Sequence, residues 1–276
     1  MLFAVFFNLS VHIEKAHRLF YNVFRKIMQE IIMPDAKHLD ELCQRAAKRN
    51  IALFSRFLNL TEQKEAEIAA RKAGAAFLLW GGAEDCERKM LGAGGDEAPE
   101  TYEYPLSCLK ITPKSAKFSN PLQHRDVLGS LMGLGFEREL IGDIIIREDA
   151  AYVFCTDKMA PFICENLPKI GNTSVNCEES VPPEGPLRSV REMRVQVASP
   201  RIDAIVAHLF RLSRTDAQTL FRQGKIMVDD AECQRTDYAL KEGQVVSVRG
   251  FGRFRYMGVE TLSKKGKSNL LIHLYA

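Results

Sequence analysis

Three observations on the sequence predict an α+β fold in three parts. Apolar residues near the start recur mostly at helical spacing. The middle of the chain alternates β-type runs with two helical segments. The last 90 residues combine two short helices with β-type segments and hold 16 Lys and Arg against 9 Asp and Glu, a net charge of +7. The 276 residues suffice for two or three domains.

The composition, 46% hydrophobic and 26% charged, is that of an ordinary globular protein. The seven cysteines stand singly, without a C-x-x-C pair. This spacing is atypical of zinc sites, and we expect no metal and no cofactor. An odd number of cysteines without a secretory signal fits reduced thiols in the cytoplasm.

Residues 1–32 form an extension that we treat apart. Its apolar start, MLFAVFFNLSV, lacks a preceding basic region and is too short to cross a bilayer, so we expect no membrane association. A polar helix start, PDAKHLDELC, follows from Pro34. We therefore expect native synthesis to begin at Met28 or Met33.

Residues 33–101 are predicted to form a mainly helical domain. One amphipathic helix spans 36–49, and a second begins after Thr61 and ends at Gly74. AAFLLW indicates a buried strand, ERKML a brief helix, and GAGGDEAPET a domain boundary.

Residues 102–178 show the element order β-α-β-β-α-β. The strands are YPLSCLKIT, GDIII, AYVFC and NTSVNC, and the helices are LQHRDVLGSLMGL and KMAPFICENL. This order is typical of a ferredoxin-like domain, the architecture that RNA-recognition motifs share. Tyr152 and Phe154 alternate on one strand face, where they either stack on bases or belong to the core. Secondary RNA contacts are predicted at Lys110, His124, Arg125 and Tyr152, with packing and helix-end electrostatics as the alternative role of the first three.

Residues 179–187 are rich in proline and acids and indicate a linker to a basic domain at 188–276. In this domain, Ser199-Pro200 predicts the start of a helix that runs to about Phe210. Ser213 is expected to cap a second helix, Gly224 to end it, and KIMVD to follow as a strand.

The start of the second helix is a candidate phosphate site, because its free N–H groups attract anions and Arg214 adds a full charge. We expect neighbouring cations to extend it into an RNA-binding strip. The predicted strip consists of Arg201, Ser213, Arg214, Lys225, Arg249 and Arg253. As an alternative, some of these arginines only pair with Asp203, Asp216 or Asp237.

Several pieces together, RIDAIVA, LSRTDAQTL, GKIMVDD and KEGQVVSVRGFGRF, resemble the S-four (αL-motif) RNA-binding domain. The preceding pieces LLWGGAEDCERKMLGAG, PLSCLKITPKSAKFSNPLQHRDVLGSLMGLGFERELIGDIII and AYVFCTDKMAPFICENLPKIGNTSV are similar to the YlmH family of bacterial RNA-binding proteins. The resemblance covers roughly residues 33–256.

This resemblance implies a non-catalytic cytoplasmic protein that binds structured RNA, rRNA or tRNA, on the large ribosomal subunit. It further implies a role in quality control of stalled nascent chains and a link to cell division, with no small-molecule substrate. The alternative is an RNA-modifying enzyme, of the pseudouridine synthase or methyltransferase type, that uses the S-four domain for targeting. Against that alternative, the chain lacks the G-R-x-D motif of pseudouridine synthases.

Overall fold

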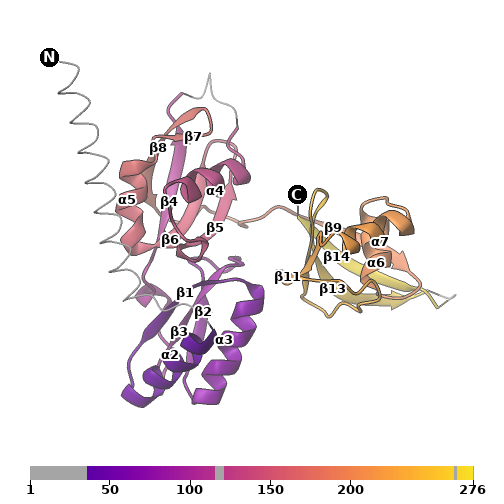
Figure 1. The fold of residues 1–276 in the computed structure, drawn as a ribbon, viewed down its shortest axis with the longest axis horizontal. Helices are drawn as coiled ribbons and strands as arrows, with labels where there is room; N and C mark the ends of the chain where they lie inside the picture. The colour runs from indigo at the N-terminus through magenta and orange to yellow at the C-terminus, as the bar shows by residue number, and fades with distance from the viewer. Residues whose placement is uncertain (1–35, 116–120, 264–265, 276) are drawn as a thin grey trace.

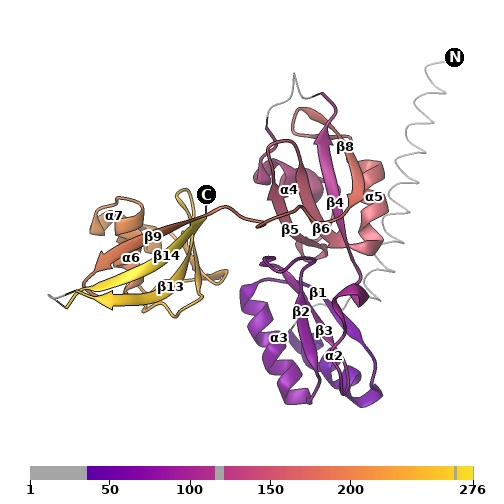
Figure 2. The same ribbon diagram turned by 180° about the vertical axis from the view of Figure 1, so that it is seen from behind.

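The structure is a computed structural model that describes residues 36–115, 121–263 and 266–275. It has three lobes, each built on its own antiparallel sheet (Figures 1 and 2). The expectations for residues 1–32 and the initiating methionine lie outside the described residues. No helix in the described part of the chain is long and apolar enough to cross a membrane.

The N-terminal lobe packs two helices on a three-stranded sheet. Asn59 caps the second helix, where its side chain accepts hydrogen bonds from the amides of Thr61 and Glu62. Gly74 ends this helix with a left-handed φ of 68°. The elements are α2 (Ala36–Arg49), β1 (Leu53–Leu58), α3 (Leu60–Ala73), β2 (Phe77–Trp80) and β3 (Lys89–Ala93), and the strand order is β1-β3-β2.

The brief helix predicted at ERKML is wrong. This stretch enters β3, the central strand of the N-terminal sheet, which is paired on both sides. Three charged residues followed by apolar ones fit either structure locally, and the two neighbouring strands decide it by satisfying the backbone groups of β3. Strand β1 was not predicted either, so this lobe is an α/β unit and not a mainly helical one.

The central lobe places two helices on one face of a five-stranded sheet (Figure 1). Its main elements follow the predicted order of strands and helices. They are β4 (Leu106–Pro113), α4 (His124–Gly133), β5 (Ile141–Ile146), β6 (Ala151–Thr156), α5 (Ala160–Asn166), β7 (Lys169–Ile170) and β8 (Thr173–Ser180), with strand order β5-β6-β4-β8-β7. Glu179 and Ser180 still pair with β4, so the linker begins at Val181 and not at residue 179.

The helix-free face of the central sheet packs against the N-terminal lobe. Phe154 is fully buried there with Phe57 and Met90. Gly142 allows this approach, because a Cβ at this position would lie 2.7 Å from the Phe57 ring. Phe154 therefore cannot stack on a base. It is a core residue, which is the other of its two predicted roles.

The C-terminal lobe is a six-stranded sheet with α6 and α7 on one face. Ser213 caps α7 and Gly224 follows it with a φ of 61°, both as predicted. The N-cap of α6 is Arg201 and not Ser199, and its side chain makes no capping bond. The elements are β9 (Val190–Val197), α6 (Ile202–Leu209), α7 (Arg214–Arg222), β10 (Ile226–Val228), β11 (Ala231–Glu232), β12 (Val245–Val248), β13 (Gly252–Leu262) and β14 (Ser268–Tyr275).

Replacing Phe154 by alanine tests the contact between the first two lobes. The substitution leaves a cavity between Phe57 and the central sheet, and we expect a loss of about 3–5 kcal/mol in the free energy of unfolding. Chemical denaturation measures the loss. Tyr102→Ala is the control, since the Tyr102 side chain is 83% exposed and its removal opens no cavity. Equal stability of the two variants would contradict the packing described here.

Candidate nucleic-acid interface

The corner between α6 and α7 presents free cations beside a helix N-terminus. Ser213 Oγ accepts a hydrogen bond from the Asp216 amide at 3.0 Å, which fixes the start of α7. Arg214 is the first residue of this helix; it is exposed and makes no ion pair with a described residue. Arg211, with a left-handed φ of 52°, turns the chain just before it and is also exposed. The partial positive charge of the helix end adds to both guanidinium groups.

The turn between β12 and β13 lies beside this corner. The Arg249 amide donates to the Lys225 carbonyl at 2.9 Å, so the chain at Arg249 adjoins the residue after Gly224. The Phe251 ring lies 5.8 Å from the Phe210 ring at the end of α6, and Phe251 stays 46% exposed. We call Arg211, Ser213, Arg214, Lys225, Arg249 and Phe251 the corner surface. It offers cations for phosphates and an aromatic ring for a base.

Two residues of the predicted strip are engaged elsewhere. Arg201 is bound to Asp203 through two hydrogen bonds of 3.1 and 3.0 Å, which is the alternative named for it. Arg253 neighbours the buried Phe254 on β13, and alternation along a strand turns it to the opposite face of the sheet. The six predicted residues therefore do not form one strip.

Sequence reasoning missed Phe251 and Arg211. The signal for Phe251 was present in GFGRF, where a large apolar residue stands between two glycines in a turn and cannot be covered by its neighbours. Arg211 carried no comparable signal, because its left-handed φ depends on how α6 and α7 meet.

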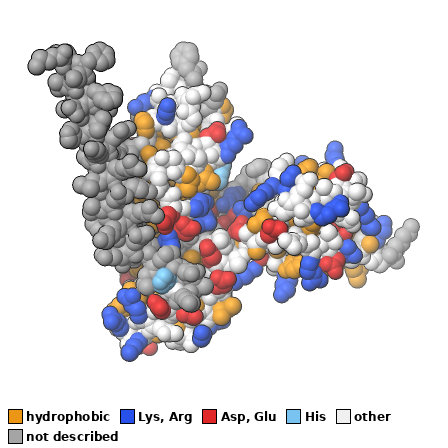
Figure 3. Space-filling model, in the orientation of Figure 1, with side chains coloured by type: hydrophobic (Ala, Val, Ile, Leu, Met, Phe, Trp, Pro, Cys, Tyr) orange, Lys and Arg blue, Asp and Glu red, His pale blue; other side chains and the backbone are white. Residues whose placement is uncertain are grey.

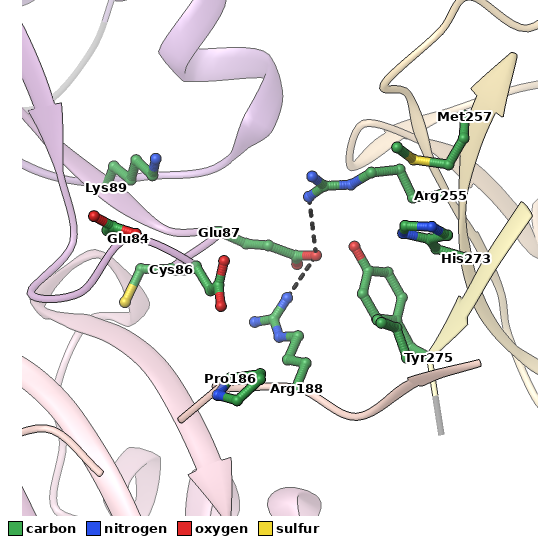
Figure 4. A pocket seen from close by; sticks show the side chains of 12 residues that line it. Glu84, Cys86, Glu87, Lys89, Pro186, Arg188, Arg255, Met257, His273 and Tyr275 are labelled. Carbon is green, nitrogen blue, oxygen red and sulfur yellow. Dashed lines mark ion pairs between the residues drawn. The ribbon is translucent and has the colours of Figure 1, made fainter. Parts of the chain in front are cut away.

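On the opposite face of the C-terminal sheet, Arg253 joins a buried ion cluster at the junction of the lobes. The cluster centres on Glu87, which is only 6% exposed. Its carboxylate lies 2.5 Å from Arg188 and 2.8 Å from Arg253, with Arg255 at 4.0 Å. Figure 4 shows Glu87 reaching from the N-terminal lobe between Arg188 and Arg255, and Figure 3 shows charged side chains of both signs gathered where the lobes meet.

Asp143, on β5, ties the central lobe to the same cluster. It is 4% exposed and accepts hydrogen bonds from the amides of Glu87 and Arg88 at 2.7 and 3.1 Å. Its carboxylate also lies 2.8 Å from Arg188. One linker arginine thus bridges a carboxylate from the N-terminal lobe and one from the central lobe.

A second junction is made by the turn between β10 and β11. Asp229 and Asp230 have left-handed φ values of 49° and 67°, as a two-residue type I′ hairpin turn requires. Lys64 contacts the Asp229 carboxylate at 2.5 Å, and Thr61 donates to the Asp229 carbonyl at 2.5 Å. The turn therefore docks on the first residues of α3.

The secondary candidates of the central lobe are spread over two places. Lys110 and Tyr152 are directly opposed on β4 and β6, and both are half-buried. His124 and Arg125 begin α4 and are exposed, and Arg125 pairs with Asp126 at 3.4 Å. Although His124 is exposed at the surface, partial desolvation by the surrounding protein, with the positive charges of Arg138 and Arg188 nearby, lowers its pKa.

Glu87→Gln tests the buried cluster. The substitution leaves Arg188 and Arg253 each with one carboxylate, and we expect a loss of about 3–5 kcal/mol in the free energy of unfolding. The radius of gyration measured by small-angle X-ray scattering should rise as the C-terminal lobe separates. The neighbouring exposed Glu84→Gln is the matched control. An unchanged radius with unchanged stability would show that the cluster does not hold the lobes.

Asp229→Asn tests the second junction through pH. Burial alone would raise the pKa of Asp229, but Lys64, the Val245 amide and Gln244 outweigh it and lower this pKa below 3.8. A lowered pKa stabilises the fold above the unfolded value and loses that contribution as the pH falls through the folded value. The stability difference between the wild type and Asp229→Asn should therefore shrink below about pH 4. Thermal melts as a function of pH measure it, with the exposed Asp149→Asn as control; a difference independent of pH would refute the assignment.

Comparisons with known proteins agree with the family suggested by the sequence pieces. A family model described as "Putative RNA-binding domain in YlmH" matches residues 99–182. The cell division protein YlmH from Streptococcus pneumoniae is a similar solved structure, with a TM-score of 0.44 and 24% identity over 52% of this chain and 87% of that one. The ribosome-associated protein quality control protein P2 of Bacillus subtilis (strain 168) is 30% identical over 214 residues, which cover 76% of this chain and 82% of that protein. The chain belongs to the YlmH family of RNA-binding proteins.

Proposed function

We propose that the protein is a non-catalytic RNA-binding factor that uses the corner surface to hold structured RNA. The observation that carries the proposal is the corner surface itself. Arg211, Arg214, Lys225 and Arg249 make no ion pair with a described residue. Phe251, 46% exposed, lies two residues after Arg249 and contacts Phe210 at the end of α6. Unpaired cations beside an exposed aromatic ring suit a phosphate backbone with an unpaired base.

We further propose that the C-terminal lobe is an S-four domain and that the central lobe is a ferredoxin-like domain related to RNA-recognition motifs. Helices α6 and α7, which meet at a corner and are followed by strands β10 to β14, support the first assignment. The strand order β5-β6-β4-β8 with two helices on one face supports the second. The N-terminal lobe covers part of the usual base-stacking face of the central sheet, and of the predicted secondary contacts Lys110 and Tyr152 lie on that face.

The RNA that we propose is rRNA or tRNA on the large ribosomal subunit, in quality control of stalled nascent chains. The name of the Bacillus subtilis relative, which is ribosome-associated and acts in protein quality control, supports this assignment. A link to cell division, the second role that the sequence resemblance implies, belongs to the same proposal. A ribosome-associated role places the protein in the cytoplasm.

The chemistry of three buried cysteines argues against one form of the alternative, an RNA-modifying enzyme that uses a cysteine nucleophile. A methyltransferase or synthase that used a cysteine would need a thiolate near neutral pH. Burial raises the pKa of Cys86 and of Cys108 to about 12 and that of Cys43 to about 11. These thiols act as small apolar core residues.

Arg214→Ala tests the proposal. Five phosphate contacts give a slope of log affinity against log salt of about −3.5 on single strands and a steeper one on duplex, and losing one contact reduces it by about 0.7–0.9. We expect roughly tenfold weaker binding to purified large ribosomal subunits. Arg194→Ala is the matched control, because it removes the same charge from the same lobe where Arg194 pairs with Glu260.

Crosslinking with RNA sequencing in cells gives the second readout for this proposal. The wild type should crosslink to ribosomal RNA or tRNA, and Arg214→Ala should lose these crosslinks. An unchanged RNA profile, or a salt slope near zero for the wild type, would overturn the assignment of the corner surface.

A further inference from the structure

A cleft between the central and C-terminal lobes is lined by cations without an acid. It encloses about 340 Å³. Three arginines and a histidine line it, from four segments: His124 at the start of α4, Arg147 after β5, Arg188 in the linker and Arg253 on β13. No aspartate or glutamate belongs to its lining. A cavity with this lining favours an anionic ligand.

The acids that hold these arginines lie behind the cleft. Arg188 contacts Glu87 and Asp143, and Arg253 contacts Glu87 and Asp230. None of these three carboxylates belongs to the lining of the cleft. Arg147 donates to the carbonyls of Pro186 and Leu187 and has no carboxylate partner among the described residues. A guanidinium group has five N–H donors, so the acids fix each arginine from one side and leave donors for a ligand.

The remaining lining suits the other half of a nucleotide. The edge strand β5 lines one side of the cleft, where the partly exposed Ile146 supplies an apolar contact, and Tyr275 supplies an aromatic ring. The Arg188 guanidinium lies 5.8 Å from the centroid of that ring and holds it in place. Figure 4 shows Arg188 and Tyr275 side by side at the edge of the neighbouring hollow. A volume of this size admits one nucleotide and excludes a base-paired helix.

We propose that this cleft binds one unpaired nucleotide of RNA, with its phosphate on Arg147, Arg188 and Arg253 and its base against Tyr275. This inference rests on the proposed RNA-binding function and adds to it a second, separate site. The corner surface lies on the helix side of the C-terminal sheet, and the cleft lies on the opposite side. Structured RNA at the corner surface and an unpaired nucleotide in the cleft are therefore distinct binding events.

The test uses the full chain and two kinds of RNA. Fluorescein-labelled oligouridine and oligoadenosine probe the cleft by anisotropy, and large ribosomal subunits probe the corner surface by co-sedimentation. Ser189→Glu and His124→Glu each place a carboxylate at the cleft; both positions are exposed, and neither side chain makes a hydrogen bond or ion pair in the described structure. Ser174→Glu, exposed on β8 at the far side of the central sheet, is the matched control.

We expect Ser189→Glu and His124→Glu each to weaken oligonucleotide binding by about tenfold, the effect of losing one stacked or charge-assisted contact. Ser174→Glu should bind as the wild type does. Arg214→Glu should lose binding to ribosomal subunits and keep binding to the oligonucleotides. Photocrosslinking with 4-thiouridine should label Tyr275 or the peptide 144–147.

The outcomes separate the two proposals. Oligonucleotide binding that is unaffected by both cleft variants, or that is lost with Arg214→Glu, would overturn the cleft and leave the corner surface standing. Wild-type protein that binds ribosomal subunits and no oligonucleotide would also overturn the cleft and leave the corner surface standing. Wild-type protein that binds neither RNA would overturn the proposed function and the cleft together.

Discussion

The arrangement of the three lobes depends on the buried carboxylate of Glu87. A carboxylate taken out of water is costly unless cations and hydrogen bonds replace its hydration. Its cations come from the linker, as Arg188, and from the C-terminal sheet, as Arg253. Its own amide is bound by Asp143 of the central lobe. Each lobe therefore supplies a partner for a charged group that is buried by the others. Removing any one of these partners leaves an unpaired charge in the low-dielectric junction.

Such a cluster gives little net stability and much geometric definition. Apolar packing already joins the first two lobes through Phe57 and Phe154, whereas the contacts with the C-terminal lobe that the structure defines are mainly polar. The hydrogen bonds and ion pairs there are directional, so they fix the angle at which the C-terminal sheet meets the others. They also hold the arginines that face the cleft in fixed positions. On a flexible linker, without these contacts, the same side chains would not be ordered.

The sequence revealed what local physics determines. Ser213, Gly224 and the β-α-β-β-α-β order depend on capping, on a left-handed glycine and on hydrophobic periodicity, all of which act within a few residues. The strand at Lys89–Ala93 did not follow from local pattern, since two distant strands decide it. The role of Arg253 was hidden for the same reason, because Glu87 lies far from it in the sequence. The exposure of Phe251 could be predicted from its glycine-flanked turn, but its position depends on its contact with Phe210.

Strand β10 connects the corner surface to the junction with the N-terminal lobe over a very short distance. Lys225 precedes this three-residue strand on the corner surface, and Asp229 follows it at the junction with α3. At about 3.3 Å per residue, the two points are roughly 13 Å apart along a strand paired on both sides. A strand of this kind has no freedom to flex between its ends. RNA bound at the proposed corner surface would therefore lie at a fixed distance from the N-terminal lobe, and the two would move together.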